Sequence, residues 1–225
     1  RAVAKYVPAD GQIFDLGAGD GQTFAHVAAD VPAGTTVSIE EPNPAYLAAY
    51  QTLLERHPHL RLGVTVTTSI DDLVAAAHRR DVGLPRQASI DLALALHMIY
   101  FSTDVPETLC TVLELVKPGG AFFSVVTDEP AAYCGTVLRS FLDSGGELGA
   151  ADRYLAAVDE RRRLLAPAGE GGGELTRAAA DRGIDVEVRS VRQPSRMYGH
   201  SLADLLAISN ISVLVNVPGT QKFDS

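Results

Sequence analysis

The first half of the chain alternates short apolar segments with segments that have helical spacing. Apolar or β-branched runs predict strands, and apolar positions three and four residues apart predict helices. The predicted strands are residues 13–16, 35–39, 64–67, 90–96 and 121–126, and the predicted helices are residues 22–29, 45–56, 71–80 and 105–116. Repeated units of this kind predict an α/β fold with a doubly wound, mostly parallel sheet flanked by helices, because right-handed crossovers leave few other topologies.

The second half of the chain is less regular. Further helical patterns lie at residues 131–142, 152–165, 175–182 and 202–208. Candidate strands lie at residues 186–191 and 212–217, and residues 169–173 form a glycine-rich stretch. Residues 212–217 also fit a helix. The glycine-rich stretch follows no strand, so we expect a surface linker rather than a phosphate-binding loop. Two more strands would make the sheet seven-stranded, and 225 residues suit one domain over residues 1–225 with a helical insertion at about 130–182.

Composition and charge exclude several classes of function. The chain has 28 acidic and 19 basic residues and a formal net charge of −9. This balance argues against a nucleic-acid partner, because phosphate binding favours clustered Lys and Arg. No apolar run approaches the roughly 18–20 residues that span a bilayer, so no membrane partner is expected. Cys110 and Cys134 lie in no Cys/His pattern with zinc spacing, and we predict no metal site. No signal peptide opens the sequence, which predicts a cytoplasmic protein.

The strongest local signal lies at residues 13–21, where a strand leads into a turn with three glycines and a helix follows. Gly17 and Gly19 permit positive φ and leave no Cβ between the backbone and a ligand. The helix N-terminus offers unpaired N–H groups, but the spacing lacks the third glycine of the dinucleotide fingerprint. Asp15 and Asp20 add carboxylates, which suit a cationic amine or sulfonium better than a diphosphate. The alternative is a strand-to-helix turn that binds no ligand.

Two acidic residues end the second predicted strand, roughly 20 residues after the glycine turn, where an acid holds the ribose hydroxyls in folds of this type. Val37, Ile39 and Glu41 share one face of the strand, because successive side chains alternate. We therefore favour Glu41 as the ribose ligand, with Glu40 as the second choice. The alternative for either residue is a solvated surface acid.

Taken together, these residues resemble the class I S-adenosylmethionine-dependent methyltransferases. The resemblance covers about residues 10–126, and it rests on the glycine turn, Glu41, Asp91 and the Lys-Pro-Gly-Gly breaker at residues 117–120. It implies a Rossmann-like methyltransferase fold with S-adenosyl-L-methionine as the cofactor and S-adenosyl-L-homocysteine as the product. The cofactor contacts that it implies are Asp15, Gly17, Ala18 and Gly19 for the methionine part, Glu41 for the ribose, and Ser69 and Ile70 for the adenine.

A narrower resemblance, to the histamine N-methyltransferase group, lies at residues 91–101 and continues in the Asp-Val-Pro-Glu-Thr-Leu segment at residues 104–109. The Glu41–Pro42 pair also matches that group. The resemblance implies that Leu96 packs against the cofactor and that His97 stands where a polar residue contacts the substrate. The animal enzyme has an amide at that position, so histamine is not carried over as the substrate.

Four side chains are candidates for the acceptor site. His97 follows a buried strand, where an imidazole can orient an amine or take a proton. Tyr100 is the second catalytic candidate, and Tyr100, Phe101 and Tyr133 are candidates for the wall of a substrate pocket. The alternatives are a hydrogen-bonded structural histidine and aromatic side chains that only pack.

These features predict an enzyme that transfers a methyl group to a nitrogen or oxygen of a small-molecule metabolite by in-line displacement. The main alternative keeps the fold and cofactor, but the enzyme cyclises or cleaves S-adenosylmethionine itself without methyl transfer. A protein or nucleic-acid methyltransferase and a catalytically silent binding subunit are further alternatives. The sequence carries no signal for the oligomeric state.

Overall fold

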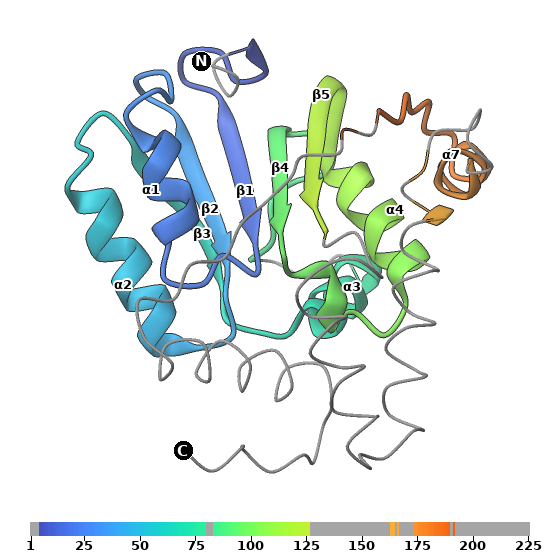
Figure 1. Ribbon diagram of the computed structural model, residues 1–225, viewed down its shortest axis with the longest axis horizontal. Coiled ribbons are helices and arrows are strands. Elements are labelled where there is room, and N and C mark those ends of the chain that lie inside the picture. Colours follow the sequence, from blue (N-terminus) through green and yellow to red (C-terminus); the bar gives the residue numbers. More distant parts are fainter. Residues whose placement is uncertain are drawn as a thin grey trace, which may run out of the picture. The chain divides into compact units, whose positions relative to one another are not determined.

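Five parallel strands form the sheet in the described part of the chain. The computed structural model describes residues 5–79, 83–126, 163–164, 166, 173–189 and 191. The strand order is β3-β2-β1-β4-β5 (Figure 1). The strands are β1 (Gln12–Leu16), β2 (Thr36–Glu40), β3 (Arg61–Val66), β4 (Ile90–Leu96) and β5 (Val116–Val125). This order, with every pairing parallel, confirms the predicted doubly wound α/β class.

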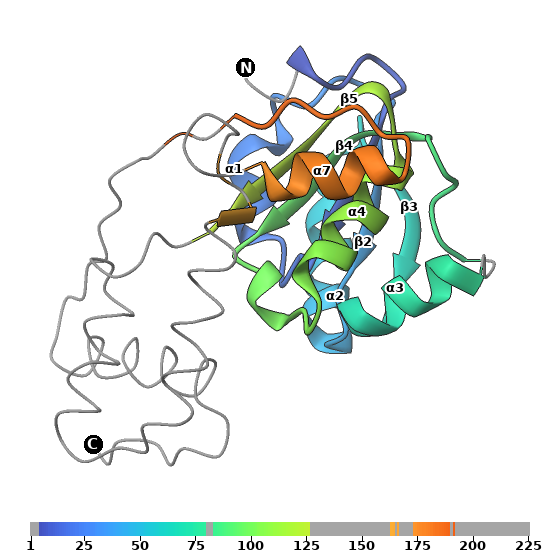
Figure 2. The same cartoon turned by 90° about the vertical axis from the view of Figure 1, so that its right-hand side faces the viewer.

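Helices cover both faces of this sheet. They are α1 (Gln22–Ala28), α2 (Pro44–Glu55), α3 (Ile70–Arg79), α4 (Val105–Leu115) and α7 (Glu174–Asp181), with a 3₁₀ turn, η2 (Ile99–Phe101), before α4. Helices α1 and α2 lie on one face and α3 and α4 on the other, while α7 runs beside α4 (Figures 1 and 2). Asn43 and Asp104 cap α2 and α4 through side-chain oxygens that accept backbone N–H bonds, and a proline follows each cap in the first turn.

The chain divides by contacts into two compact units. Residues 1–126 with 175–186 form the first, and residues 127–174 with 187–225 form the second. The sheet and the helices named above lie in the first unit, apart from Glu174 at the start of α7. Within the described residues, no helix combines the length and the apolar character that crossing a bilayer requires.

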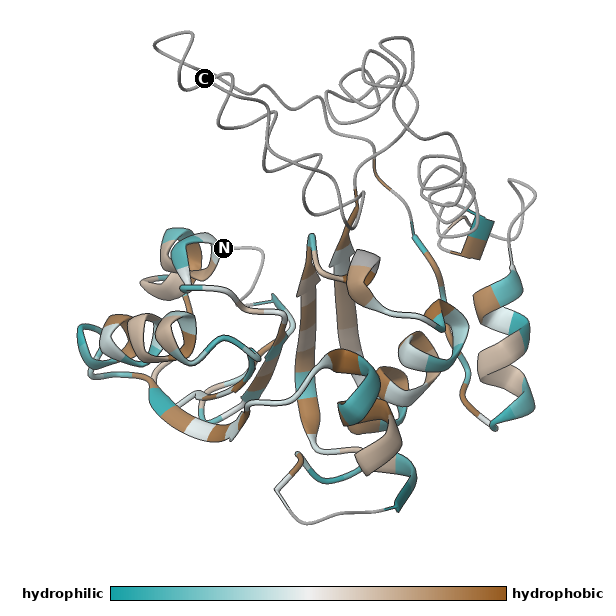
Figure 3. Ribbon diagram, turned by 90° about the horizontal axis from the view of Figure 1, so that it is seen from below, coloured by the Kyte–Doolittle hydropathy of each residue, from teal (hydrophilic) through white to brown (hydrophobic). Residues whose placement is uncertain are grey.

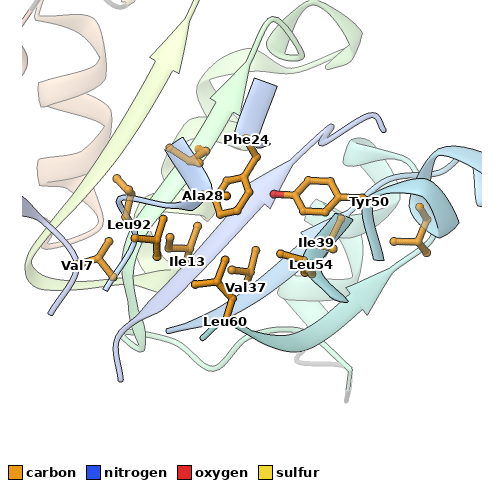
Figure 4. Packing of buried hydrophobic residues seen from close by; sticks show 13 residues of the cluster. Val7, Ile13, Phe24, Ala28, Val37, Ile39, Tyr50, Leu54, Leu60 and Leu92 are labelled. Carbon is orange, nitrogen blue, oxygen red and sulfur yellow. The ribbon is translucent and has the colours of Figure 1, made fainter. Parts of the chain in front are cut away.

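The hydrophobic core of the first unit lies between α1, α2 and the adjacent face of the sheet (Figure 4). Phe24 and Tyr50 pack ring to ring, with centroids 5.6 Å apart, above Ile13 and Val37 of the strands. The residues of β4 before Leu96 are all buried, which confirms the prediction of a strand covered on both faces. The central strands consist mainly of hydrophobic residues, whereas the helices mix hydrophobic and hydrophilic residues (Figure 3). This core holds the first two strands beneath their two helices.

The structure corrects the predicted breaker at residues 117–120. These residues belong to β5, because Ile90 pairs with Val116 and the next pair is Leu92 with Ala121. Asp91 therefore lies opposite the whole Lys-Pro-Gly-Gly segment. Its buried carboxylate accepts a hydrogen bond from the Gln12 N–H (2.8 Å) and forms an ion pair with Lys117. The segment bulges out of the ladder within β5 instead of separating the helix from the strand, since a neighbouring strand supplies an anchor.

A second correction concerns the late part of the chain. Residues 184–189 form no strand, although their alternation of Ile and Val with charged residues predicts one over 186–191. Alternation describes a half-buried strand only if a neighbouring strand pairs with it. Glu187 and Arg189 instead form an exposed ion pair with each other (2.8 Å). Of the other late elements, 131–142, 202–208 and 212–217 lie outside the described residues, and only 163–164 of 152–165 are described, both helical. The single domain with an insertion stays a prediction.

Loss of the Asp91 carboxylate is expected to destabilise the sheet. Asp91→Ala leaves the Gln12 N–H and the Lys117 ammonium without their acceptor, so the free energy of unfolding should fall by about 2–4 kcal/mol. Asp91→Asn keeps an oxygen for the Gln12 N–H and should cost less. Urea denaturation followed by circular dichroism measures both variants. Equal losses for the two, or a loss below about 0.5 kcal/mol for Asp91→Ala, would contradict this account.

Candidate active site

The carboxyl ends of β1, β2 and β4 meet at one edge of the sheet, because the three strands are adjacent and parallel. The loop after β1, residues 17–21, is called the glycine loop below. Gly17 and Gly19 have φ values of +56° and +59°, as predicted, and Gly21 caps α1 at φ +82°. A Cβ on Gly19 would meet no atom within 4 Å, so this residue borders open space. The loop therefore presents its backbone at the edge where α/β folds bind ligands.

Both acids at the end of β2 bind the glycine loop. Glu40 accepts a hydrogen bond from the Gly17 N–H (2.7 Å), and Glu41 accepts one from the Gly19 N–H (2.8 Å). The second oxygen of Glu41 accepts from the Asn43 N–H (2.8 Å). The two side chains are 1% and 6% exposed, which excludes the interpretation of either as a solvated surface acid. Each carboxylate oxygen can accept a further bond, so Glu41 keeps acceptor capacity for a ligand.

Asp15 lies beneath the glycine loop rather than at its surface. Its side chain is 3% exposed and accepts a hydrogen bond from the Tyr50 hydroxyl (2.8 Å). The Tyr50 ring packs so closely on Gly21 that a Cβ there would lie 2.9 Å from it. This role of Tyr50 was not predicted from the sequence, where the residue belongs only to the helical pattern over residues 45–56. A hydroxyl among buried apolar positions was the available signal, since a buried tyrosine O–H finds a partner.

Burial controls the charge of two of these carboxyls. Desolvation raises the pKa of Asp15 to about 7, although the Tyr50 hydroxyl opposes the shift. Desolvation also raises the pKa of Glu40 to about 7; the Gly17 N–H lowers it, and the charges of Glu41 and Asp15 raise it further. Desolvation and the Asp15 charge raise the pKa of Tyr50 as well. Ionised carboxylates here would be stabilised by a positive charge near the loop.

The loop after β4, residues 97–101, carries the acceptor candidates and is called the β4 loop. Leu96 is half-buried at the end of β4. His97 has φ +57°, and its N–H donates to the Val125 carbonyl (3.0 Å). Its side chain is exposed, yet enough protein surrounds the imidazole that desolvation lowers its pKa. Tyr100 belongs to η2, and the Phe101 side chain is 57% exposed. Tyr133 lies outside the described residues.

Ser69 and Asp20 make hydrogen bonds that position the starts of their own helices, and Ile70 is buried beside Ser69. The Ser69 hydroxyl donates to Asp72 (2.7 Å) and accepts from the Asp72 N–H, which caps α3. Ile70 is buried in the first turn of α3. Asp20 accepts from the Gln22 N–H at the start of α1 (3.1 Å). Their contacts with a cofactor stay predictions. No group of three or more His, Cys, Asp or Glu side chains in the described ranges could hold a metal ion.

The raised pKa values of Asp15 and Glu40 predict a pH dependence of stability. The ordinary pKa values are 3.8 and 4.5, and burial raises both to about 7. The folded state therefore binds the proton more tightly than the unfolded chain. The resulting stabilisation is complete below the unfolded pKa and is lost as the pH rises through the folded pKa. We expect the free energy of unfolding to fall between about pH 4 and pH 7.

Asp15→Asn should reduce this fall, because it removes one titrating group and keeps an oxygen that accepts from Tyr50. Glu55→Gln changes an exposed carboxylate of α2 and serves as the control. Urea denaturation at about pH 5 and about pH 8 measures the difference. A wild-type protein that becomes more stable over this interval, or an Asp15→Asn variant with the full wild-type fall, would show that Asp15 does not titrate in this way.

The comparisons with known proteins identify the family. A family model described as a methyltransferase domain matches residues 1–169. An arsenic(III) S-adenosylmethionine methyltransferase from Chlamydomonas reinhardtii is 20% identical, with 52% of this chain and 38% of that chain covered and a TM-score of 0.42. The YcgJ protein of Bacillus subtilis is 14% identical, with 63% and 55% covered and a TM-score of 0.44.

The Haemonchus contortus phosphoethanolamine N-methyltransferase 2, solved in complex with S-adenosyl-L-methionine, is 15% identical, with 62% of this chain and 31% of that chain covered and a TM-score of 0.43. The chain thus spans about a third to about half of the length of these three proteins. No curated protein matches the chain.

The family match covers every residue that forms the described site. Residues 1–169 contain the glycine loop, both acids at the end of β2 and the β4 loop. The match also covers the features on which the predicted resemblance rests, namely the glycine turn, Glu41, Asp91 and residues 117–120. The chain therefore belongs to the methyltransferase domain family, in agreement with the resemblance predicted from its glycine loop and β2 acids.

Proposed function

We propose that this chain binds S-adenosyl-L-methionine at the glycine loop and transfers its methyl group to a nitrogen or oxygen of a small-molecule metabolite. The observation that carries the proposal is the pair of hydrogen bonds from Gly17 and Gly19 to Glu40 and Glu41. These bonds hold the backbone at Gly19, which borders open space, beside the Glu41 carboxylate, which can still accept hydrogen bonds from a ligand. We place the acceptor chemistry nearest to that of the histamine N-methyltransferase group, on the strength of the residues around His97.

The described residues fit the proposed cofactor. Glu41 uses one lone pair on each oxygen for the Gly19 and Asn43 N–H groups, so both oxygens can still accept from ribose hydroxyls. The open space at Gly19 allows close approach to the backbone. The carboxyls of Asp15 and Glu40 lie behind the loop and supply negative potential for the positive sulfonium and ammonium groups. A diphosphate would be repelled by the same carboxyls.

The cofactor supplies an activated methyl group on a good leaving group. The protein therefore has to align donor and acceptor and exclude water, which can contribute roughly 7–11 kcal/mol. In the proposed reaction the acceptor lone pair forms the new bond to carbon while the carbon–sulfur bond breaks. Neutral His97, whose pKa is lowered by desolvation, accepts the proton that a nitrogen or oxygen acceptor releases. Tyr100, Phe101 and Tyr133 would line the acceptor pocket, and Leu96 would contact the cofactor.

The charge and composition support a small acceptor. A formal net charge of −9 argues against a nucleic-acid substrate, because phosphate binding favours clustered Lys and Arg. We therefore infer a small-molecule substrate and no nucleic-acid partner.

Cofactor affinity tests the assignment of the ribose ligand. Isothermal titration with S-adenosyl-L-homocysteine should show binding to the wild-type chain. Glu41→Gln should weaken it by about tenfold to a hundredfold, because hydrogen bonds to a charged acceptor contribute about 1.5–3 kcal/mol. Glu40→Gln keeps an oxygen for the Gly17 N–H and should weaken it less than Glu41→Gln does, while Glu55→Gln, at an exposed position of α2, is the control and should leave it unchanged. If Glu40→Gln lost more affinity than Glu41→Gln, Glu40 would be the ribose ligand. If the wild-type chain did not bind, the proposed cofactor site would be refuted.

Product analysis separates methyl transfer from the alternative. Incubation with S-adenosylmethionine alone should leave it intact, and a metabolite pool should yield S-adenosylhomocysteine and a methylated product by mass spectrometry. Methylthioadenosine with a cyclised amino acid would instead identify an enzyme that cyclises the cofactor. His97→Ala should lower turnover by about 10²-fold or more with little change in cofactor affinity. Full activity of that variant would remove His97 from the mechanism.

A further inference from the structure

The β4 loop rests directly on the glycine loop through Met98. A Cβ placed on Gly17 would lie 2.3 Å from Met98 Cβ, 2.9 Å from Cγ and 3.4 Å from Cε. The Met98 side chain therefore runs along the Gly17 backbone over most of its length. Met98 is 3% exposed, although the two loops that meet in this contact, the glycine loop and the β4 loop, lie at the carboxyl edge of the sheet. Only glycine leaves room for this contact.

Met98 also holds the residues on each side of it. His97, immediately before it, adopts φ +57°, a left-handed conformation that is unfavourable for a non-glycine residue. The backbone on either side must offset this cost. The His97 N–H bond to Val125 anchors one side, and the buried Met98 side chain anchors the other. The Met98 carbonyl accepts from the Phe101 N–H (2.9 Å) and so closes η2.

We propose that Met98 is a positioning residue that couples cofactor binding at the glycine loop to the orientation of His97 and η2. The proposal rests on the proposed function, because it takes the glycine loop as the cofactor site and His97 as the acceptor contact. A ligand that orders the glycine loop fixes the surface on which Met98 lies. Met98 then restricts the backbone of His97 and of the turn that carries Tyr100. The contact is apolar and contains no titratable group.

The coupling has a direct spectroscopic readout. Protein labelled with ¹³C at histidine Cε1 gives an NMR signal for His97, which a His97→Gln variant assigns. S-adenosyl-L-homocysteine is the probe, since it binds without reaction. In the wild type, saturating probe should shift the His97 signal. In Met98→Ala the probe should bind within about threefold of wild-type affinity, while the shift of His97 should fall to less than about a third.

Two further variants separate coupling from a general loss of stability. Met98→Leu keeps the apolar volume and should restore most of the shift of His97. Leu54→Ala removes a buried side chain from the last turn of α2, far from both loops in sequence, and should destabilise the fold by a comparable amount without changing the shift. If Met98→Ala is not folded at 25 °C, Met98→Val replaces it and should show a partial loss.

The outcomes distinguish this inference from the proposed function. A wild-type chain that does not bind the probe refutes the proposed cofactor site. If the wild type binds the probe and Met98→Ala keeps the full shift of the His97 NMR signal, only the coupling is overturned. A Met98→Ala variant whose affinity falls by more than about tenfold would make Met98 part of the cofactor site and would also overturn the coupling.

Discussion

The geometry of the site depends on the hydrogen bonds that join the end of β2 to the glycine loop. The loop has positive φ at Gly17 and Gly19, and this conformation points their N–H groups toward the neighbouring strand. Carboxylates are strong acceptors for such groups. Both acids come from the strand directly beside β1, where Leu16 pairs with Glu40. A change in the register of these strands would move both acids away from the loop, so the loop conformation and the sheet register support each other.

This arrangement buries acidic side chains at high density. Burial of an ionised carboxylate without a cation is unfavourable, and protonation lowers the cost. In the ranges that the structure describes, no Lys or Arg forms an ion pair with Asp15, Glu40 or Glu41. The pKa values of Asp15 and Glu40 near 7 follow from this environment. A cationic ligand at the loop is therefore linked to the protonation of the residues beneath it, which agrees with a sulfonium donor.

The glycine loop and the β4 loop pack directly against each other because Gly17 has no side chain. Met98 occupies the space that a Cβ would need, and its contact joins the loop after β1 to the loop after β4. Close packing makes such a contact sensitive to changes of a few tenths of an ångström. The same residue therefore accounts for the glycine at position 17, and it directly follows His97, whose backbone has φ +57°.

The sequence by itself determined the order of strands and helices in residues 12–115, because hydrophobic periodicity and turn glycines are local properties. It also located the glycine loop and the two acids. Only the tertiary structure assigned Glu40 to Gly17 and Glu41 to Gly19, buried Asp15 against Tyr50, and kept residues 117–120 within β5. It also left residues 184–189 unpaired. Each of these outcomes depends on a partner distant in sequence, whose position follows from sheet register and packing rather than from local propensity.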